Sequence, residues 1–277
     1  MNGRSEALQA SAVVAGPERF VDTVRFPLTQ LASDEGQALV ARCRVQLAAE
    51  GACVLESFLL PDAAAAARAE LEGRLAEAFY CTKSHNPYLA EDDPLRPADH
   101  PRNRPQVSDL GALADDLIPD GVLRQLYRWD ALQAFIAALL EVPRLYPYAD
   151  PLGSLNLNIF QPGQQLGWHY DNADWAITLM LQPAEAGGVY EYVPWIRKPD
   201  DENYGAVAAI LDGDDNGVRR LAMGEGALVL FRGRYSLHRV TPVEGSRPRL
   251  VAVFSYDTEP GVMLTEHNRE LFYGRTR

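Results

Sequence analysis

Three side chains in the second half of the sequence have the types and the spacing to hold one metal ion. His169 and Asp171 form a His-x-Asp pair at the end of a predicted strand, where side chains two positions apart project to the same face. His238 lies near the start of a later predicted strand. Two imidazoles and one carboxylate form the facial triad that binds non-haem Fe(II) and leaves coordination positions open. A lone His-x-Asp pair is common by chance, so the prediction also depends on the residues after His238.

Two arginines lie beyond His238 at the head of the next predicted strand. The chain turns at Gly245, so Arg247 and Arg249 begin an antiparallel strand that returns toward the triad. A guanidinium forms paired hydrogen bonds with a carboxylate, so a metal on one side and an arginine on the other suit a dicarboxylate. The two arginines share strand parity. We prefer Arg249 because it directly precedes the apolar alternation that starts at Leu250, and a surface position remains the alternative for either residue.

The elements that must position these residues change in character along the chain. From residue 144 the apolar residues recur with a period of two, and glycine and proline turns divide them into short runs. Many short strands without intervening helices predict an antiparallel sandwich or barrel. The strand candidates are 154–160, 165–170, 175–182, 188–193, 206–211, 218–222, 227–232, 236–241 and 249–256.

The first half has helical periodicity instead. Helices are predicted over 33–51, over 61–79 and from a cap at Asp130, with a short strand at 53–58. Segment 81–110 carries five prolines and is predicted as a long irregular loop that covers something. Residues 1–20 are predicted to be a disordered tail.

With these residues and elements in place, the chain resembles the Fe(II)- and 2-oxoglutarate-dependent dioxygenases. The resemblance covers roughly 144–257. It depends on Asn158, Gly163, residues 167–172 (GWHYDN), the Gly187-Gly188 turn, 226–231 and 238–249. More narrowly, the chain is similar to the small-molecule enzymes that include the amino-acid halogenases and their hydroxylase relatives. That similarity depends on residues 191–194 (EYVP), Arg197 and 85–89 (HNPYL).

The resemblance implies a fold and a set of cofactors. The fold class is mainly β with N-terminal helices, in which a double-stranded β-helix (cupin-type jelly roll) core is buttressed by helices. Residues 21–277 then form a single dioxygenase domain. It comprises a helical buttress with the Pro-rich loop (21–143), the jelly-roll core (144–257) and a C-terminal extension (258–277). The implied cofactors are Fe(II), the cosubstrate 2-oxoglutarate and O2, with Arg249 pairing the far carboxylate of the cosubstrate.

The resemblance also implies a reaction. Halogenases of this type have a small residue at the carboxylate position, so that chloride binds the iron. Asp171 fills that position here, so we expect hydroxylation of an unactivated C–H bond in a free amino acid or similar small polar metabolite, with succinate and CO2 as co-products. A larger natural-product substrate is an alternative, as are desaturation and cyclisation. A non-catalytic cupin-type ligand-binding protein is the hypothesis from a different class.

One inward-facing strand raises a difficulty for the cosubstrate site. Asn158 shares parity with Phe160, and it either contacts cosubstrate or substrate or makes a structural hydrogen bond. Phe160 stands where many relatives carry a tyrosine that bonds the cosubstrate, so that hydroxyl must come from elsewhere. Tyr146 and Tyr148 are two candidate sources, with core packing as their alternative.

Five further residues are candidates for substrate contact, each weighed against a packing or solvated-loop position. They are His85, Asn172, Trp175, Trp195 and Arg197, the last as a clamp on a substrate carboxylate. Trp168 and Tyr170 are instead expected to pack on the outer face of the sheet. His100 and His267 are expected at the surface.

Composition limits the partners. The 277 residues are 47% hydrophobic and carry a formal net charge of −12, which repels nucleic-acid phosphates and anionic lipid. We therefore expect a small-molecule substrate and neither a nucleic-acid nor a membrane partner. The three cysteines form no Cys-x-x-Cys pair, which favours reduced thiols in the cytoplasm, and no signal peptide is visible. Whether the protein forms a homodimer is left open.

Overall fold

The computed structural model describes residues 16–277. Most of the predicted tail, residues 1–15, therefore lies outside the described residues. The remainder is folded: Pro17–Phe20 form a 3-10 helix, and Phe20 packs against the main core. Among the described residues, no helix combines the length and apolar character that crossing a bilayer requires.

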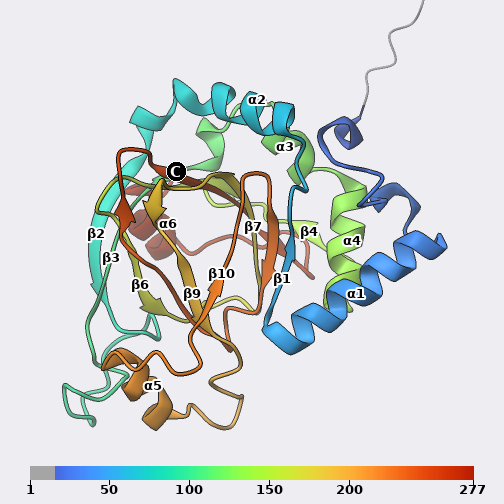
Figure 1. Ribbon diagram of the computed structural model, residues 1–277. Helices are drawn as coiled ribbons and strands as arrows, with labels where there is room; N and C mark the ends of the chain where they lie inside the picture. The colour runs from blue at the N-terminus through green and yellow to red at the C-terminus, as the bar shows by residue number, and fades with distance from the viewer. Residues whose placement is uncertain (1–15) are drawn as a thin grey trace, which may run out of the picture.

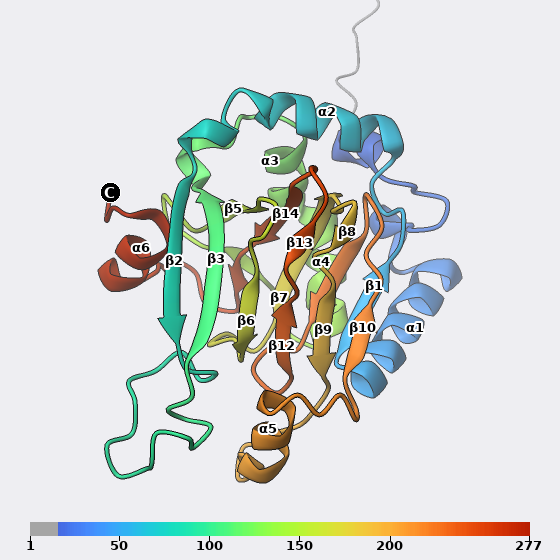
Figure 2. The same cartoon turned by 60° about the vertical axis from the view of Figure 1, so that its left-hand side comes forward.

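Two antiparallel sheets form the centre of the molecule (Figures 1 and 2). The larger has the order β1-β11-β7-β14-β5-β3-β2, with bounds β1 Ala52–Leu55, β11 Leu228–Phe231, β7 Ala176–Gln182, β14 Arg249–Phe254, β5 Leu155–Phe160, β3 Gln106–Leu113 and β2 Phe79–His85. The smaller has the order β10-β9-β12-β6, with bounds β10 Arg219–Leu221, β9 Tyr190–Val193, β12 Leu237–Val240 and β6 Leu166–His169. Two short pairs join β4 (Tyr146–Pro147) to β15 (Tyr256–Asp257) and β8 (Ala186–Gly187) to β13 (Val243–Glu244).

The chain alternates between the two sheets from β5 onward. β5, β7, β11 and β14 lie in the larger sheet, while β6, β9, β10 and β12 lie in the smaller one. Eight strands shared in this way between two antiparallel sheets make a jelly roll. The predicted fold class, mainly β with a jelly-roll core and N-terminal helices, is confirmed.

Strand alternation gives the larger sheet two different faces. On β5, Leu157 and Ile159 belong to the main core cluster, together with Leu39 of α1 and Phe135 of α4. Phe160 points the other way and packs with Val240 of the smaller sheet. Helices therefore cover one face, and the other face lines the space between the sheets.

Two of the six helices in the described residues, α1 and α6, begin at a residue whose side chain caps them. Their bounds are α1 Asp34–Glu50, α2 Pro61–Glu72, α3 Val122–Tyr127, α4 Asp130–Leu140, α5 Tyr204–Leu211 and α6 Glu266–Tyr273. Ser33 caps α1 by accepting a hydrogen bond from the Gly36 backbone N–H at 3.1 Å, and Gly51 ends that helix with a φ of 66°. Asp130 is the first residue of α4, but it is not the cap, because the cap position is Trp129 and carries no side-chain bond.

Three predicted elements are wrong in the structure. Residues 206–211 are helical and belong to α5, because an almost continuous apolar run does not distinguish a strand from a buried helix. The helix predicted over 61–79 ends at Glu72, just before Gly73, and Phe79 already begins β2. The irregular segment predicted over 81–110 is confined to 86–105, because β2 and β3 pair and extend the larger sheet.

The loop 86–105 lies beside α5, below the strand ends in Figure 2. Arg104 joins the two segments: its guanidinium donates to the Leu211 carbonyl at 3.0 Å and pairs with Asp212 at 2.6 Å. The loop and α5 together cover the outer face of the smaller sheet, where Trp168 and Tyr170 pack with Val207 of α5. The outward positions predicted for Trp168 and Tyr170 are confirmed.

Candidate metal centre

The fold brings His169, Asp171 and His238 together at one end of the space between the sheets. His169 ends β6 and is the register partner of His238 on β12, with ring centroids 4.1 Å apart. Asp171 Oδ1 lies 3.7 Å from His169 Nε2 and 3.4 Å from His238 Nε2. One ligand atom from each residue falls within 4.8 Å of the other two, which is the size of a metal site.

Backbone carbonyls orient both imidazoles. His169 Nδ1 lies 2.8 Å from the Gly167 carbonyl oxygen, and His238 Nδ1 lies 2.9 Å from that of Ser236. Because a carbonyl only accepts, each Nδ1 carries the hydrogen and donates it. Each Nε2 lone pair is then free to face Asp171, which is the tautomer that a metal ligand needs. Burial, with a contribution from His238, lowers the pKa of His169 to about 3, so this ring is neutral at neutral pH.

The carboxylate of Asp171 is held ionised beside these rings. Burial by itself would raise the pKa of Asp171, but the neighbouring His238 and His169 outweigh it and hold the pKa below its ordinary value. The Asp171 backbone N–H donates to the Gly233 carbonyl at 3.2 Å. A Cβ at Gly233 would overlap the Asp171 carboxylate, so this carboxylate position requires a glycine there. No local pattern in the sequence marks Gly233.

The donor set fits Fe(II). Two imidazole nitrogens and one carboxylate oxygen match the two-histidine, one-carboxylate arrangement of non-haem iron sites. The three donors come from one end of the space between the sheets, so the coordination positions away from them stay open to other ligands.

His85 reaches the metal centre through a hydrogen-bonded chain. Its Nδ1 donates to the Asn86 carbonyl at 2.9 Å, so its Nε2 accepts from the Ser108 hydroxyl at 2.6 Å. Ser108 Oγ in turn accepts from the Gly167 backbone N–H at 3.1 Å. Gly167 is also the residue whose carbonyl orients His169, and the His85 and His169 rings lie 6.2 Å apart. His85 therefore stands next to the metal ligands.

Arg249 is a deeply buried cation. It begins β14, it is 3% exposed, and its guanidinium lies 5.3 Å above the Phe160 ring. Burial lowers the pKa of Arg249 to about 10, which leaves it charged at neutral pH. Within residues 16–277 it forms no side-chain hydrogen bond or ion pair. An unpaired buried charge is unfavourable, so this site suits an incoming anion.

A cavity of about 330 Å³ gives access to Arg249. Gly188, Met180 and Tyr190 are among the residues that line it with Arg249. Arg247 does not share this setting, because it is exposed and donates at 3.4 Å to the Ala184 carbonyl. The alternative choice of Arg247 for the cosubstrate is therefore not supported by its position.

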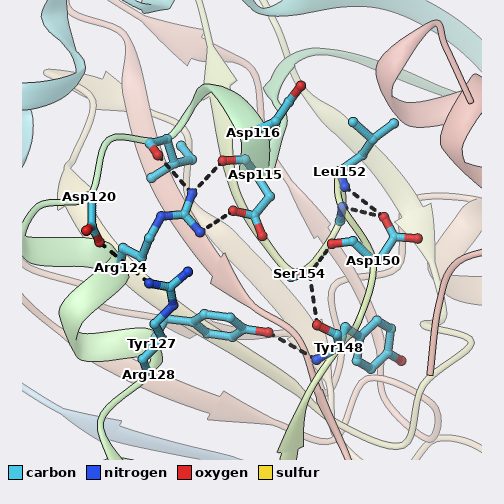
Figure 3. Close-up of polar contacts among 12 residues, drawn as sticks. Asp115, Asp116, Asp120, Arg124, Tyr127, Arg128, Tyr148, Asp150, Leu152 and Ser154 are labelled. Atoms are coloured by element: carbon cyan, nitrogen blue, oxygen red, sulfur yellow. Dashed lines mark hydrogen bonds and ion pairs between the residues drawn. The ribbon is translucent and has the colours of Figure 1, made fainter. Parts of the chain in front are cut away.

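The remaining candidates for the cosubstrate site are Asn158, Tyr146 and Tyr148, and they lie in different parts of the fold. Asn158 alternates with Leu157 and shares the inner face with Phe160. Tyr146 lies in β4, paired with Asp257, and the Tyr148 backbone N–H donates to the Tyr127 hydroxyl at 3.1 Å (Figure 3). Tyr127 belongs to the main core cluster on the helix-covered side. Their place beside the β4–β15 pair, outside the two main sheets, gives no support to the expectation that Tyr146 or Tyr148 replaces the missing tyrosine.

The other four substrate candidates do not converge on the metal. Trp175 packs against the main core, and the Trp195 indole N–H donates to the Ala48 carbonyl at 3.1 Å beside α1. Asn172 is exposed, and its carbonyl accepts a hydrogen bond from Arg234. Arg197 is already engaged: Nε donates to the Arg234 carbonyl at 2.6 Å, and the guanidinium pairs with Glu202 at 3.1 Å.

The two remaining histidines differ from each other. His267 is exposed, as predicted. His100 is partly exposed in the loop 86–105, and its ring packs edge-on against Tyr204 of α5, at 4.5 Å between centroids.

Comparison with known proteins identifies a family and a shared fold. Residues 36–270 match the family model described as HalD, Halogenase D. No curated protein matches the sequence. Among solved structures, AviO1 from Streptomyces viridochromogenes is similar with a TM-score of 0.53 at 20% identity, over 80% of this chain and 96% of that one.

Two other solved structures have the same fold. An oxidoreductase of the 2OG-Fe(II) oxygenase family from Burkholderia pseudomallei gives a TM-score of 0.51 at 13% identity, over 80% of this chain and 92% of that one. HygX from Streptomyces hygroscopicus, solved with nickel, 2-oxoglutarate and hygromycin B, gives 0.53 at 14% identity, over 78% of this chain and 86% of that one. The predicted fold, that of the Fe(II)/2-oxoglutarate oxygenases, is confirmed.

Proposed function

This chain belongs to the Halogenase D family, and we propose that it is an Fe(II)- and 2-oxoglutarate-dependent oxygenase that hydroxylates an unactivated C–H bond of a free amino acid or similarly small polar metabolite. The observation that carries the proposal is the His169-Asp171-His238 triangle at the smaller sheet, with the buried Arg249 on the larger sheet across the space between them. We also propose that residues 21–277 form one domain, because a single core cluster joins the helices of the first half to the strands of the second.

The cofactors and the chain have separate tasks in this proposal. When bound, Fe(II), 2-oxoglutarate and O2 supply the oxidising chemistry, in which one oxygen atom enters the substrate and the other enters succinate, with release of CO2. His169, Asp171 and His238 would hold the metal and fix its open positions. Arg249 would bind the distal carboxylate of 2-oxoglutarate with a charge-assisted hydrogen bond. Apolar side chains such as Phe160 and Val240 exclude water from the space between these ends.

Asp171 favours hydroxylation over halogenation. A halide on the iron needs a coordination position that no protein carboxylate occupies. The Asp171 carboxylate lies within 3.7 Å of both imidazole Nε2 atoms and is ionised by them. A chloride at the same place would meet both an occupied position and a like charge. We therefore propose that this member of the Halogenase D family hydroxylates its substrate, because Asp171 occupies the position that a halide would need.

A second candidate substrate class has support from the structural relatives. HygX was solved with hygromycin B bound, and SnoN is described as an epimerase of nogalamycin biosynthesis, with a TM-score of 0.55 at 13% identity. A larger natural product, or another oxidative outcome such as desaturation or cyclisation, would use the same iron ligands.

A substrate screen tests the proposal. The Fe(II)-loaded protein is incubated with 2-oxoglutarate, O2 and chloride against the free amino acids, and succinate and the product masses are measured. We expect one group of related amino acids to raise succinate formation and to gain the mass of one oxygen atom. A chlorinated product would overturn the reaction class. Succinate formation driven only by large natural products would overturn the substrate class.

A further inference from the structure

Tyr190 is the side chain that spans the two ends of the candidate site. Its ring stacks on the His238 imidazole, with centroids 5.5 Å apart and an interplanar angle of 23°. It also lines the cavity that contains Arg249. Tyr190 begins β9 and is the register partner of Val240, one inward-facing position beyond His238. One phenol ring therefore lies between the metal ligands and the unpaired guanidinium.

On β5 of the larger sheet, the residue beside Arg249 is a phenylalanine, which has no hydroxyl. Phe160 is the register partner of Arg249, and the guanidinium lies over its ring. The ring offers Arg249 only a cation–π contact and gives a bound carboxylate no hydrogen-bond donor. Tyr190 packs with Phe160 and Val240 in the same small cluster, but it approaches from the smaller sheet. The smaller sheet thus provides the phenol of Tyr190 near the place where the larger sheet provides only the phenyl ring of Phe160.

The Tyr190 hydroxyl is available as a donor. A phenol keeps its proton at neutral pH, so the hydroxyl can donate. Within residues 16–277 it makes no hydrogen bond, as is also true of the Arg249 guanidinium. The half-buried Tyr190 and the buried Arg249 thus offer two donors to one cavity, and a ligand that enters it can supply the acceptor.

We propose that Tyr190 and Arg249 together bind the distal carboxylate of 2-oxoglutarate, with the Tyr190 hydroxyl supplying the hydrogen bond that Phe160 cannot. This inference rests on the proposed function. A carboxylate has lone pairs for both donors at once, so neither contact excludes the other. The Tyr190 ring also packs against His238, which fixes the distance between the two ends of the site. Tyr190 is then a specificity-determining residue for a dicarboxylate of this length.

The test compares binding of two keto acids. Dissociation constants of 2-oxoglutarate and of 2-oxopentanoate, which has a methyl group in place of the distal carboxylate, are measured by anaerobic calorimetry on the Fe(II)-loaded protein. The variant Tyr190→Phe keeps the ring that stacks on His238 and removes only the hydroxyl. Tyr192→Phe is the matched control, because Tyr192 lies on the same strand face but packs against Val229 and Phe231.

We expect Tyr190→Phe to bind 2-oxoglutarate about ten-fold more weakly or worse, since a hydrogen bond to a charged group is lost. Its affinity for 2-oxopentanoate and for Fe(II) should equal that of the unmodified protein, as should its thermal midpoint without ligand. Tyr192→Phe should change none of these values. An equal loss for both keto acids would overturn the carboxylate contact and indicate a packing role.

Two outcomes keep this inference separate from the proposed function. If Tyr190→Phe binds 2-oxoglutarate normally while Arg249→Met does not, the role of Tyr190 is wrong and the oxygenase assignment stands. If the unmodified Fe(II)-loaded protein itself fails to bind 2-oxoglutarate, the oxygenase assignment fails first.

Discussion

The two ends of the space between the sheets differ in how their charges are satisfied. At the metal end, Asp171 faces two imidazoles, each oriented by a backbone carbonyl. At the other end, Arg249 is buried and has no partner among the described residues. The first end is assembled by contacts within the chain, and the second is completed only by a ligand. The site is therefore prepared for a molecule that brings an anion to Arg249 and donor atoms to the metal.

Removing the carboxylate should disrupt the metal end most severely. In Asp171→Ala, one of three protein ligands and the only anionic one is lost. We expect Fe(II) affinity to fall more than about 100-fold, because even changes to residues behind a ligand cost roughly 10- to 100-fold, and turnover to be lost. Anaerobic Fe(II) titration measures this. Asp174→Ala, which removes an exposed carboxylate paired with Arg234, is the control and should bind Fe(II) normally.

Removing Arg249 should damage only the other end. In Arg249→Met we expect the dissociation constant of 2-oxoglutarate to rise about 100-fold, because the charge-assisted hydrogen bond to its distal carboxylate is lost. Fe(II) affinity without cosubstrate should not change. The thermal midpoint of the ligand-free variant should not fall, because an unpaired buried charge has been removed. Arg247→Met, at the exposed arginine, should leave all three values unchanged. A large loss of stability in Arg249→Met would mean that the guanidinium has a partner within the folded chain.

A methyl group at Gly233 tests how tightly the metal end is assembled. A Cβ there would overlap the Asp171 carboxylate, so Gly233→Ala must displace that ligand. We expect the Fe(II) affinity to fall about ten-fold. The affinity for 2-oxoglutarate should fall with it, because less of the protein then holds the metal. Gly205→Ala in α5 is the matched control, because a Cβ at that position meets nothing within 4 Å. Unchanged Fe(II) affinity in Gly233→Ala would show that Asp171 has more room than the structure gives it.

Acid should weaken the metal-free fold through His169. Burial holds the pKa of His169 at about 3, whereas its ordinary value is 6.5. Below pH 6.5 the unfolded chain takes up a proton that the folded chain refuses, so the free energy of unfolding falls as the pH falls toward 3. Between about pH 6.5 and 5 the loss should be at most about 1.4 kcal/mol per pH unit. Urea unfolding with a chelator should show a smaller loss in His169→Asn, and an equal loss would contradict this assignment.

Residue spacing could predict most of the metal end. His169 and Asp171 share a strand end, and His238 lies near the start of a later predicted strand. The period-two pattern, taken together with the residues after His238, therefore indicates the triad. The same pattern indicated Arg249, but parity could not separate it from Arg247. Only the structure shows that the sheet buries Arg249 and leaves Arg247 in solvent.

The missed features depend on contacts between distant segments. Gly233 and Ser108 act on Asp171 and Gly167 from other strands or loops, and no local pattern marks such a contact. The sequence does not indicate Tyr190, because its proposed role depends on the smaller sheet lying opposite Phe160, and no local pattern predicts how the two sheets pack. The run 206–211 was predicted as a strand because continuous apolar residues fit both a buried strand and a helix, and packing against Trp168 and Tyr170 decides between them.

One molecule of 2-oxoglutarate should join the two ends of the site. The visible absorption spectrum of the protein, recorded as Fe(II) and then 2-oxoglutarate are added without oxygen, measures this joint binding. We expect a weak metal-to-ligand charge-transfer band that requires both additions and that needs far more 2-oxoglutarate in Arg249→Met. Bound Fe(II) with no such band at saturating 2-oxoglutarate would show that the cosubstrate does not chelate the metal held by His169, Asp171 and His238.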